Sequence, residues 1–370
     1  MKKILYVIGG MDQGGAESFL MNIVRNIDRS KYNLAIATFL PPRDARVYKY
    51  AEELKRRKVK MYRLQDTRFK RPFYFAKQVE QLCRKEQFDI VHSQIDFMSA
   101  LVLMGARRAG VKARIAHSHN TSNPKLQANL LGRILAAFYK KLLKSCANVR
   151  LACGQKAGEF LYGSATFTVV PNGIELKKFQ FSESARQRIR AEFKIGPHEK
   201  VLLNVGRVEA QKNQDFLLSL LYLLGENYKL IIVGDGSLRE ALEKRAAMLN
   251  MTERLIITGM REDVASFYSA ADIFLLPSHF EGFPTVMIEA RASGLPCILS
   301  NRISQEVSVL DESEFLDIYS VSATQVWSEK IKQCPIKNTA ARRKSGESEA
   351  MQNFDVKTSI KLLEQVYGAC

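Results

Sequence analysis

Short apolar runs alternate along the chain with longer stretches of helical periodicity. In the first half the apolar runs read as buried parallel strands, at residues 4–8, 33–39, 89–92, 113–116 and 149–152. Helical periodicity lies between them, notably at residues 16–27 and 97–109. The second half repeats the alternation, with strands expected at residues 200–205, 229–233, 255–258, 273–277 and 296–299, and helices at 215–224, 237–250, 264–270 and 285–292. Strands spaced by helices indicate parallel βαβ units, so we expect an α/β protein of two Rossmann-like domains.

The boundary between these domains is expected at Pro171-Asn172-Gly173. Proline restricts the preceding residue to extended backbone, and Asn-Gly favours a turn. We therefore assign residues 1–171 to the first domain and residues 172–351 to the second. The remaining segment, about 352–370, is expected to be helical.

The charge of the chain is concentrated in its first half. The net charge is +18, and residues 1–171 hold 31 Lys and Arg against 12 Asp and Glu. Such asymmetry predicts that the first domain faces a polyanion. Within it, the segment Arg133–Lys144 has helical periodicity, with Ile134, Leu135, Phe138 and Leu142 on one face and most cations off it. A basic amphipathic helix of this kind is typical of an anionic membrane surface, although a core helix with a solvated cationic edge fits the pattern equally well.

Other classes of protein are disfavoured by what the sequence contains. No run of 18 apolar residues appears, and the first strand is followed by a glycine turn, so we expect a cytoplasmic protein with no membrane span. The six cysteines show no C-x-x-C spacing, so zinc is not expected. The basic first half also raises nucleic-acid binding. No helix-turn-helix, zinc or RNA-recognition signature accompanies the charge, so we expect no nucleic-acid partner.

Two carboxylates mark the second domain. Glu281 and Glu289 are eight positions apart and follow the apolar run at residues 273–276. Eight residues span a little over two helical turns, so Glu289 can lie on a helix while Glu281 remains in the loop before it. Ligands of open α/β sheets bind just past the carboxyl ends of such strands.

Two cations are predicted to lie beside them. Arg207 and Lys212 follow Gly206 at the carboxyl end of the strand at residues 200–205. Cations that converge on one point suit a pyrophosphate, whose charge grows when a nucleoside diphosphate departs. Alone, an Arg and a Lys in a loop are usually solvated, so this interpretation depends on the carboxylates.

Together these residues resemble the G-R-x4-K and E-x7-E motifs of family-4 retaining glycosyltransferases. The resemblance is strongest over residues 201–300 and implies the GT-B fold, in which two parallel-sheet domains face each other across a cleft. It implies that Arg207 and Lys212 stabilise the leaving diphosphate. Glu281 would hold the donor sugar, and Glu289 the ribose.

The resemblance also implies the remaining contacts of the donor. Gly206 and the backbone amides of Gly282, Phe283 and Thr285 would lie against it, whereas Pro284 has no amide hydrogen to donate. Arg261 would lie in the loop that lines the base. The segment at about 352–370 would pack back on the first domain.

In the first domain, a glycine turn and a histidine pair are the candidates. Gly14 and Gly15 open the first helix, and bare amides at a helix N-terminus form an anion site. The turn lacks the G-x-G-x-x-G spacing of dinucleotide folds. His117 and His119 end a strand, and the family resemblance favours His119 as the residue that touches the donor sugar. The pair could also be two metal ligands, with no third ligand evident, and His117 could be a structural histidine satisfied by backbone carbonyls.

The resemblance implies a metal-independent transferase that needs no cofactor. It would move a sugar from a nucleotide diphosphate donor, a uridine diphosphate sugar, to a glycan or lipid-linked acceptor in bacterial exopolysaccharide or capsule assembly. The enzyme would be peripheral at the cytoplasmic face of the membrane, with its basic first domain on the anionic surface. The rivals are a nucleotide-sugar epimerase or a phosphorylase-like enzyme of the same fold and, from the charge alone, a nucleic-acid binder.

Overall fold

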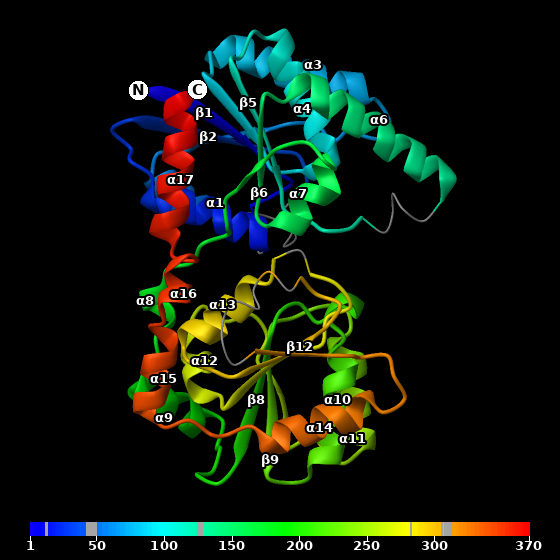
Figure 1. The fold of residues 1–370 in the computed structure, drawn as a ribbon, viewed down its shortest axis with the longest axis vertical. Helices are drawn as coiled ribbons and strands as arrows, with labels where there is room; N and C mark the ends of the chain where they lie inside the picture. Colours follow the sequence, from blue (N-terminus) through cyan, green and yellow to red (C-terminus); the bar gives the residue numbers. More distant parts are fainter. Residues whose placement is uncertain (12–13, 42–49, 124–128, 282, 305, 307–312) are drawn as a thin grey trace. The chain divides into compact units, whose positions relative to one another are not determined.

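The computed structural model describes residues 1–11, 14–41, 50–123, 129–281, 283–304, 306 and 313–370. It divides into two compact units, residues 1–173 with 356–370, and residues 174–355. Each unit is built on a parallel sheet with helices on both faces (Figure 1).

Unit 1 contains a seven-stranded sheet of order β3-β2-β1-β4-β5-β6-β7. Its strands are β1 Lys2–Val7, β2 Tyr32–Thr38, β3 Lys60–Arg63, β4 Ile90–Ser93, β5 Ala113–Ser118, β6 Val149–Ala152 and β7 Thr168–Val169. Its helices are α1 Gly15–Asn26, α2 Ala51–Arg56, α3 Pro72–Glu86, α4 Ser99–Arg108, α6 Leu130–Cys146, α7 Gln155–Tyr162 and α17 Val356–Ala369, and a 3-10 turn, η1 Asp96–Met98, precedes α4.

The two faces of this sheet carry separate apolar cores. One core joins the strands to α3, α4, α6 and α7. The other joins them to α1 and to α17, which comes from the far end of the sequence and lies beside α1 (Figure 1). The C-terminal helix is therefore a structural part of unit 1.

Unit 2 contains a six-stranded sheet of order β10-β9-β8-β11-β12-β13. Its strands are β8 Lys200–Val205, β9 Tyr228–Val233, β10 Leu255–Ile257, β11 Ile273–Leu276, β12 Cys297–Ser300 and β13 Ser313–Leu316. Its helices are α8 Leu176–Phe179, α9 Glu183–Glu192, α10 Gln214–Leu224, α11 Arg239–Met248, α12 Val264–Ala270, α13 Thr285–Ala292, α14 Ala323–Gln333, α15 Thr339–Gly346 and α16 Glu349–Gln352, with a 3-10 turn η2 at Ala210–Lys212. From β8 the chain adds strands toward one edge of the sheet, and from β11 it adds them toward the other. Because β8 and β11 are parallel neighbours at this switch point, the loops that follow them lie together.

All ten predicted strands are present, and β3, β7 and β13 are additional. These three lie at or near sheet edges and are only partly buried, so their sequences lack a continuous apolar run. Several helices were not assigned bounds from the sequence; the longest of them is α3, whose first turn lies in a run of basic and aromatic residues.

A buried carboxylate fixes the amino end of β11 and gives a first testable prediction. Asp272 is 5% exposed, forms ion pairs with Arg186 at 2.7 Å and Arg190 at 3.5 Å, and accepts from the Val201 amide at 2.7 Å. Because Asp272→Ala leaves two cations and an amide without their acceptor, we expect a loss of about 3–5 kcal/mol in the free energy of unfolding of unit 2.

Urea unfolding followed by the fluorescence of Trp327, the single tryptophan, measures this loss, because Trp327 is buried in unit 2. Glu240→Ala is the control. The Glu240 side chain is 80% exposed and pairs with Lys244, so its loss should cost less than about 1 kcal/mol. Equal losses in the two variants would contradict the assigned role of Asp272.

Candidate functional site

The loop that follows β8 is held by close backbone packing. Gly206 has φ 153°, a conformation that favours glycine, and a Cβ on Gly234 would overlap the Gly206 carbonyl oxygen. Lys212 lies at the end of this loop, and its aliphatic chain passes close to Gly206. The glycines therefore allow the loops after β8 and β9 to approach each other and leave space for the lysine.

Lys212 and Glu281 form the central ion pair of the site. Lys212 Nζ lies 2.6 Å from Glu281 Oε1, and the two side chains are only 14% and 11% exposed. A largely buried pair of this kind is shielded from water and is weakened less by salt than a surface pair. The structure thus brings Lys212 and Glu281, two predicted site residues of opposite charge, into direct contact.

Backbone and amide bonds hold the two loops that carry this pair. The Gln211 side chain donates to the Phe280 carbonyl at 2.9 Å, and the His279 amide donates to the Gln211 carbonyl at 2.9 Å. The Asn213 side chain donates to the Pro277 carbonyl at 3.2 Å. These bonds join the segment after β8 to the segment after β11, so the ion pair has a rigid frame.

Arg207 does not share this carboxylate. It donates to Glu209 Oε1 at 2.6 Å, within the same loop, and its side chain is 42% exposed. Its predicted contact with the diphosphate, beside Lys212, stays a prediction.

Two buried amides that the sequence did not single out support the same loop. Asn204 donates to the Leu275 carbonyl at 2.8 Å, which joins β8 to β11. Gln214 donates to the Arg207 carbonyl at 2.9 Å and contacts Asn204 Oδ1 at 3.3 Å. A polar residue inside the apolar run of β8 is the signal that could have identified Asn204.

Glu289 is positioned by α13 and by a buried tyrosine. The Tyr268 hydroxyl, on α12, donates to Glu289 Oε2 at 2.7 Å. Burial raises the pKa of Glu289 to about 7, although the bond from Tyr268 lowers it. Its protonation state therefore changes within the physiological range. Tyr268 is a third residue that the sequence did not reveal.

The loop between the two glutamates is only partly described. Gly282 lies outside the described residues. The Thr285 amide donates to the Phe283 carbonyl at 2.9 Å, so it is engaged within the loop, and the Phe283 ring packs against Phe354 with centroids 5.9 Å apart. The Thr285 amide, one of the donors predicted for the ligand, is thus bonded within the loop in this structure.

Arg261 lies in an ion cluster. It donates to Asp263 at 2.9 Å and to Glu192 of α9 at 2.8 Å, and these two carboxylates raise its pKa. Its guanidinium also lies 5.1 Å from the centroid of the Phe267 ring. The structure gives Arg261 a structural role between α9 and α12, and its predicted contact with the base stays a prediction.

In unit 1, Gly14 and Gly15 lie at the N-terminus of α1, as predicted. Gly14 is the N-cap, with extended backbone, and no side chain caps the helix. The first-turn amides of a helix have no intrahelical acceptor. The Glu17 carboxylate occupies the space where a Cβ on Gly14 would lie, so this N-terminus has an acidic neighbour that the sequence analysis did not weigh.

His117 lies near the end of β5 and His119 directly follows this strand, and both lie against α1. Their ring centroids are 4.3 Å apart, and both rings contact Phe19 of α1 at 5.4 and 5.8 Å. The His119 amide donates to Asp96 at 3.0 Å. Within the described part of the chain, both ring nitrogens of His119 and Nε2 of His117 are buried without a hydrogen-bond partner.

The structure corrects one alternative for His117. Its Nδ1 is 3.1 Å from His92 Nε2, so its partner is another imidazole and not a backbone carbonyl. Burial lowers the pKa of His119 to about 4 and that of His117 well below its usual value, so both are neutral at pH 7. The described residues contain no group of three or more His, Cys, Asp or Glu able to hold a metal ion.

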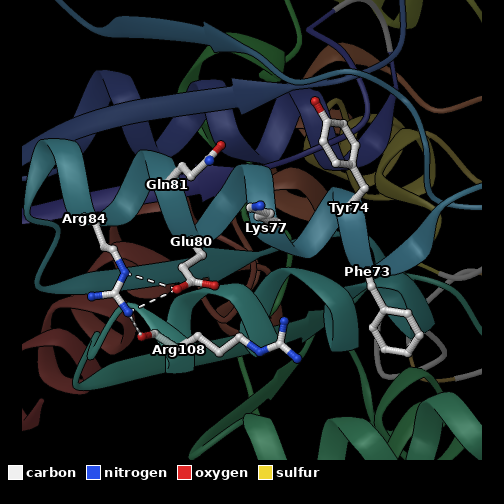
Figure 2. Close-up of a pocket in the computed structure, with 7 residues that line it drawn as sticks. All are labelled: Phe73, Tyr74, Lys77, Glu80, Gln81, Arg84 and Arg108. Carbon is white, nitrogen blue, oxygen red and sulfur yellow. Dashed lines mark hydrogen bonds and ion pairs between the residues drawn. The ribbon is translucent and has the colours of Figure 1, made fainter.

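A separate hollow lies on the outer side of α3 (Figure 2). It is lined by Phe73, Tyr74, Lys77, Glu80, Gln81, Arg84 and Arg108. Arg84 is held by Glu80 at 3.0 Å and by the Arg108 carbonyl at 2.6 Å (Figure 2). None of the predicted site residues lines this hollow.

The fold and the paired motifs define a glycosyltransferase of the GT-B class. The structure is similar to that of HepE from Anabaena in complex with UDP-glucose, with a TM-score of 0.82 at 18% identity over 100% of both chains. This similarity confirms the predicted fold class.

Family models and sequence relatives give the family itself. The model described as Glycosyl transferases group 1 matches residues 185–341, and that of Glycosyltransferase Family 4 matches residues 13–178. The putative glycosyltransferase EpsF of Bacillus subtilis is 31% identical over 99% of this chain and 96% of its own length. The capsular polysaccharide biosynthesis glycosyltransferase CapH of Staphylococcus aureus is 24% identical over 99% of both chains. The chain therefore belongs to the glycosyltransferase family that these models describe and that includes EpsF.

Proposed function

We propose that the protein transfers a sugar from a uridine diphosphate sugar, with retention of anomeric configuration, to a glycan or lipid-linked acceptor in cell-surface polysaccharide synthesis. The observation that carries the proposal is the Lys212–Glu281 pair, held 2.6 Å apart at the carboxyl ends of β8 and β11. The UDP-glucose in the HepE complex and the capsular role in the name of CapH support the donor and the pathway.

In this proposal the ion pair opens to bind the two ends of the reacting bond. Lys212 bonds to the diphosphate, while Glu281 accepts from hydroxyls of the sugar and Glu289 from the ribose. The bond from the anomeric carbon to the diphosphate breaks, and a bond to the acceptor oxygen forms on the same face. The acceptor proton passes to the departing phosphate. No metal ion or cofactor takes part.

The test is transfer of label from a panel of radiolabelled nucleotide sugars to undecaprenyl-linked glycans. A product whose anomeric configuration matches that of the donor, as read by NMR coupling, is expected. Conversion of the donor sugar to an epimer without any acceptor would favour the rival epimerase, and an inverted product would refute retention.

Helix α6 is the feature that supports a membrane-bound acceptor. Its exposed apolar side chains are Leu130, Leu131, Ile134 and Phe138, at 73%, 75%, 58% and 50% exposure. Arg133, Lys141 and Lys144 are exposed on the same helix, whereas Leu135 and Leu142 turn toward the core. No helix in the described part of the chain is long and apolar enough to span a bilayer. We infer that α6 lies on the anionic cytoplasmic face of the membrane.

Ile134→Glu with Phe138→Glu should lower binding to vesicles that contain phosphatidylglycerol at least tenfold. The reason is that two apolar side chains, each contributing about 1.5–3 kcal/mol when buried, are replaced by charges that the membrane repels. Co-sedimentation measures the bound fraction.

The matched control is Tyr222→Glu with Leu223→Glu, which makes the same charge change at exposed positions of α10 in unit 2. This variant should bind as the wild type does. Tight, salt-sensitive binding to DNA without binding to vesicles would overturn the membrane proposal.

A further inference from the structure

Five buried side chains form a row beneath the C-terminal helix. They come from β1, β4, β5, the residue after β5 and α17, and four of them are fully buried while His119 is 9% exposed: in order along the row, Tyr6, Tyr367, His92, His117 and His119. Tyr6 and His92 are register partners across β1 and β4, and His92 pairs with Ile115, two residues before His117. Side chains on one sheet face alternate with period two, so this row runs diagonally toward the carboxyl edge of the sheet.

Hydrogen bonds connect the first four members. The Tyr6 and Tyr367 hydroxyls are 2.6 Å apart, and the Tyr367 hydroxyl is 2.7 Å from His92 Nδ1. His92 Nε2 is 3.1 Å from His117 Nδ1, with ring planes 16° apart. The row ends at His117 Nε2, which has no acceptor among the described residues.

The acidity of the groups decides the direction of these bonds. A phenol O–H, with a usual pKa of about 10, is a better proton donor than the N–H of a neutral imidazole, which is a much weaker acid. The free nitrogen of an imidazole, which takes up a proton with a usual pKa of about 6.5, is a better acceptor than a phenol oxygen, which is a far weaker base. Tyr367 therefore donates to His92 Nδ1, which leaves the Tyr367 oxygen to accept from Tyr6. His92 then carries its hydrogen on Nε2 and donates to His117 Nδ1.

It follows that His117 carries its hydrogen on Nε2, the nitrogen at the end of the row. The reverse order would bury the Tyr6 hydrogen without an acceptor, and this order leaves the His117 Nε2 hydrogen without one among the described residues, so the donor and acceptor strengths decide between the two. Burial also lowers the pKa of His92 to about 3, so the row is uncharged at pH 7.

We propose that His117 Nε2–H is a fixed neutral donor to an oxygen of the donor sugar or its diphosphate, and that His92 and Tyr367 are positioning residues that set its tautomer. His117 lies next to His119 and Phe19, at the edge of the sheet where α1 begins. The identity of the ligand in this proposal rests on the proposed function. The tautomer of His117 is a property of the protein alone.

The tautomers are tested by NMR on the full chain labelled with ¹⁵N-histidine. The sequence has five histidines, so long-range ¹H–¹⁵N spectra are simple, and single His→Gln variants assign them. At pH 7 we expect His92 and His117 to be neutral, each with its hydrogen on Nε2. A hydrogen on His117 Nδ1, or a cationic ring at either position, in the spectrum of the wild-type chain would overturn the proposal.

Tyr367→Phe tests the positioning role. Without the phenol, His92 Nδ1 has no donor, and we expect at least about a tenth of His117 to carry its hydrogen on Nδ1. Tyr6→Phe should keep the wild-type tautomer, because Tyr367 still donates to His92. Tyr32→Phe is the matched control: its ring also contacts Tyr367, but its hydroxyl bonds to the Glu364 carbonyl outside the row. The same tautomer in all three variants would refute the role of Tyr367.

Titration with UDP and with UDP-glucose tests the contact with the ligand. A shift of the His117 Nε2 signal that saturates together with transfer activity is expected. If label transfer is intact and this signal does not move, the contact is refuted while the proposed function stands. If no nucleotide sugar is transferred, the proposed function fails. The tautomers of His92 and His117 are then still tested by the spectrum of the protein without ligand.

Discussion

Replacing Lys212 by alanine is expected to lower kcat about 100-fold or more, with a much smaller change in the KM for the donor. In the proposed function the Lys212 ammonium stabilises the charge that grows on the leaving diphosphate, and lost stabilisers of this kind cost about 10²–10³ in kcat. Stabilisation that acts mainly in the transition state appears in kcat, not in KM. Single-turnover transfer of labelled sugar, at saturating donor, measures the loss in rate.

Two further variants separate this role from a structural one. Lys229→Ala is the matched control, because Lys229 is 13% exposed and pairs with Glu199 at 3.5 Å in the same unit. It should retain near wild-type transfer. The single variant Lys212→Ala leaves the Glu281 carboxylate without its lysine. The double variant Lys212→Ala, Glu281→Gln also removes the charge of that carboxylate. Restored transfer in this double variant would mean that the uncompensated carboxylate caused the loss, and would contradict the assignment of Lys212.

The features that the sequence could predict are those that depend on neighbours along the chain. The apolar runs of β8 and β11 identify buried strands, and the order of βαβ units places the loops after them at one sheet edge. That was sufficient to predict that Lys212 and Glu281 lie together. Their bond at 2.6 Å follows from how the loops are joined, which involves Gln211 and Asn213.

What could not be predicted depends on contacts between distant segments. Tyr367 reaches His92 across 275 positions, and Tyr268 reaches Glu289 from the preceding helix. A tyrosine in an amphipathic helix has the pattern of an ordinary core residue, so periodicity gives no sign of a polar role. Arg207 shows a different limit of sequence-based prediction. Its motif was recognised, but its ion pair with Glu209 in the same loop was not predicted.

The partly buried position of Glu289 has a consequence for pH. Wild-type affinity for UDP-glucose is expected to rise with pH between about 5.5 and 8.5, with a midpoint near the Glu289 pKa of about 7. Only the ionised carboxylate can accept from both ribose hydroxyls, and hydrogen bonds to a charged group contribute about 1.5–3 kcal/mol. Glu289→Gln should therefore bind about 10- to 100-fold more weakly at pH 8, with little dependence on pH. UDP-glucose is the correct ligand for calorimetry, because its diphosphate has no group that titrates in this range.

Tyr268→Phe and protein stability provide the two checks on this interpretation. The Tyr268 bond lowers the Glu289 pKa, so its removal should move the midpoint of binding above that of the wild type. The folded-state pKa is raised above the ordinary value of 4.5, so protonated Glu289 contributes stability that is fully present below about pH 4.5 and is lost as the pH rises through about 7. Glu289→Gln should therefore lose less thermal stability than the wild type between pH 5 and pH 8. An affinity that does not change with pH in the wild type, or changes equally in Glu289→Gln, would show that another group controls donor binding.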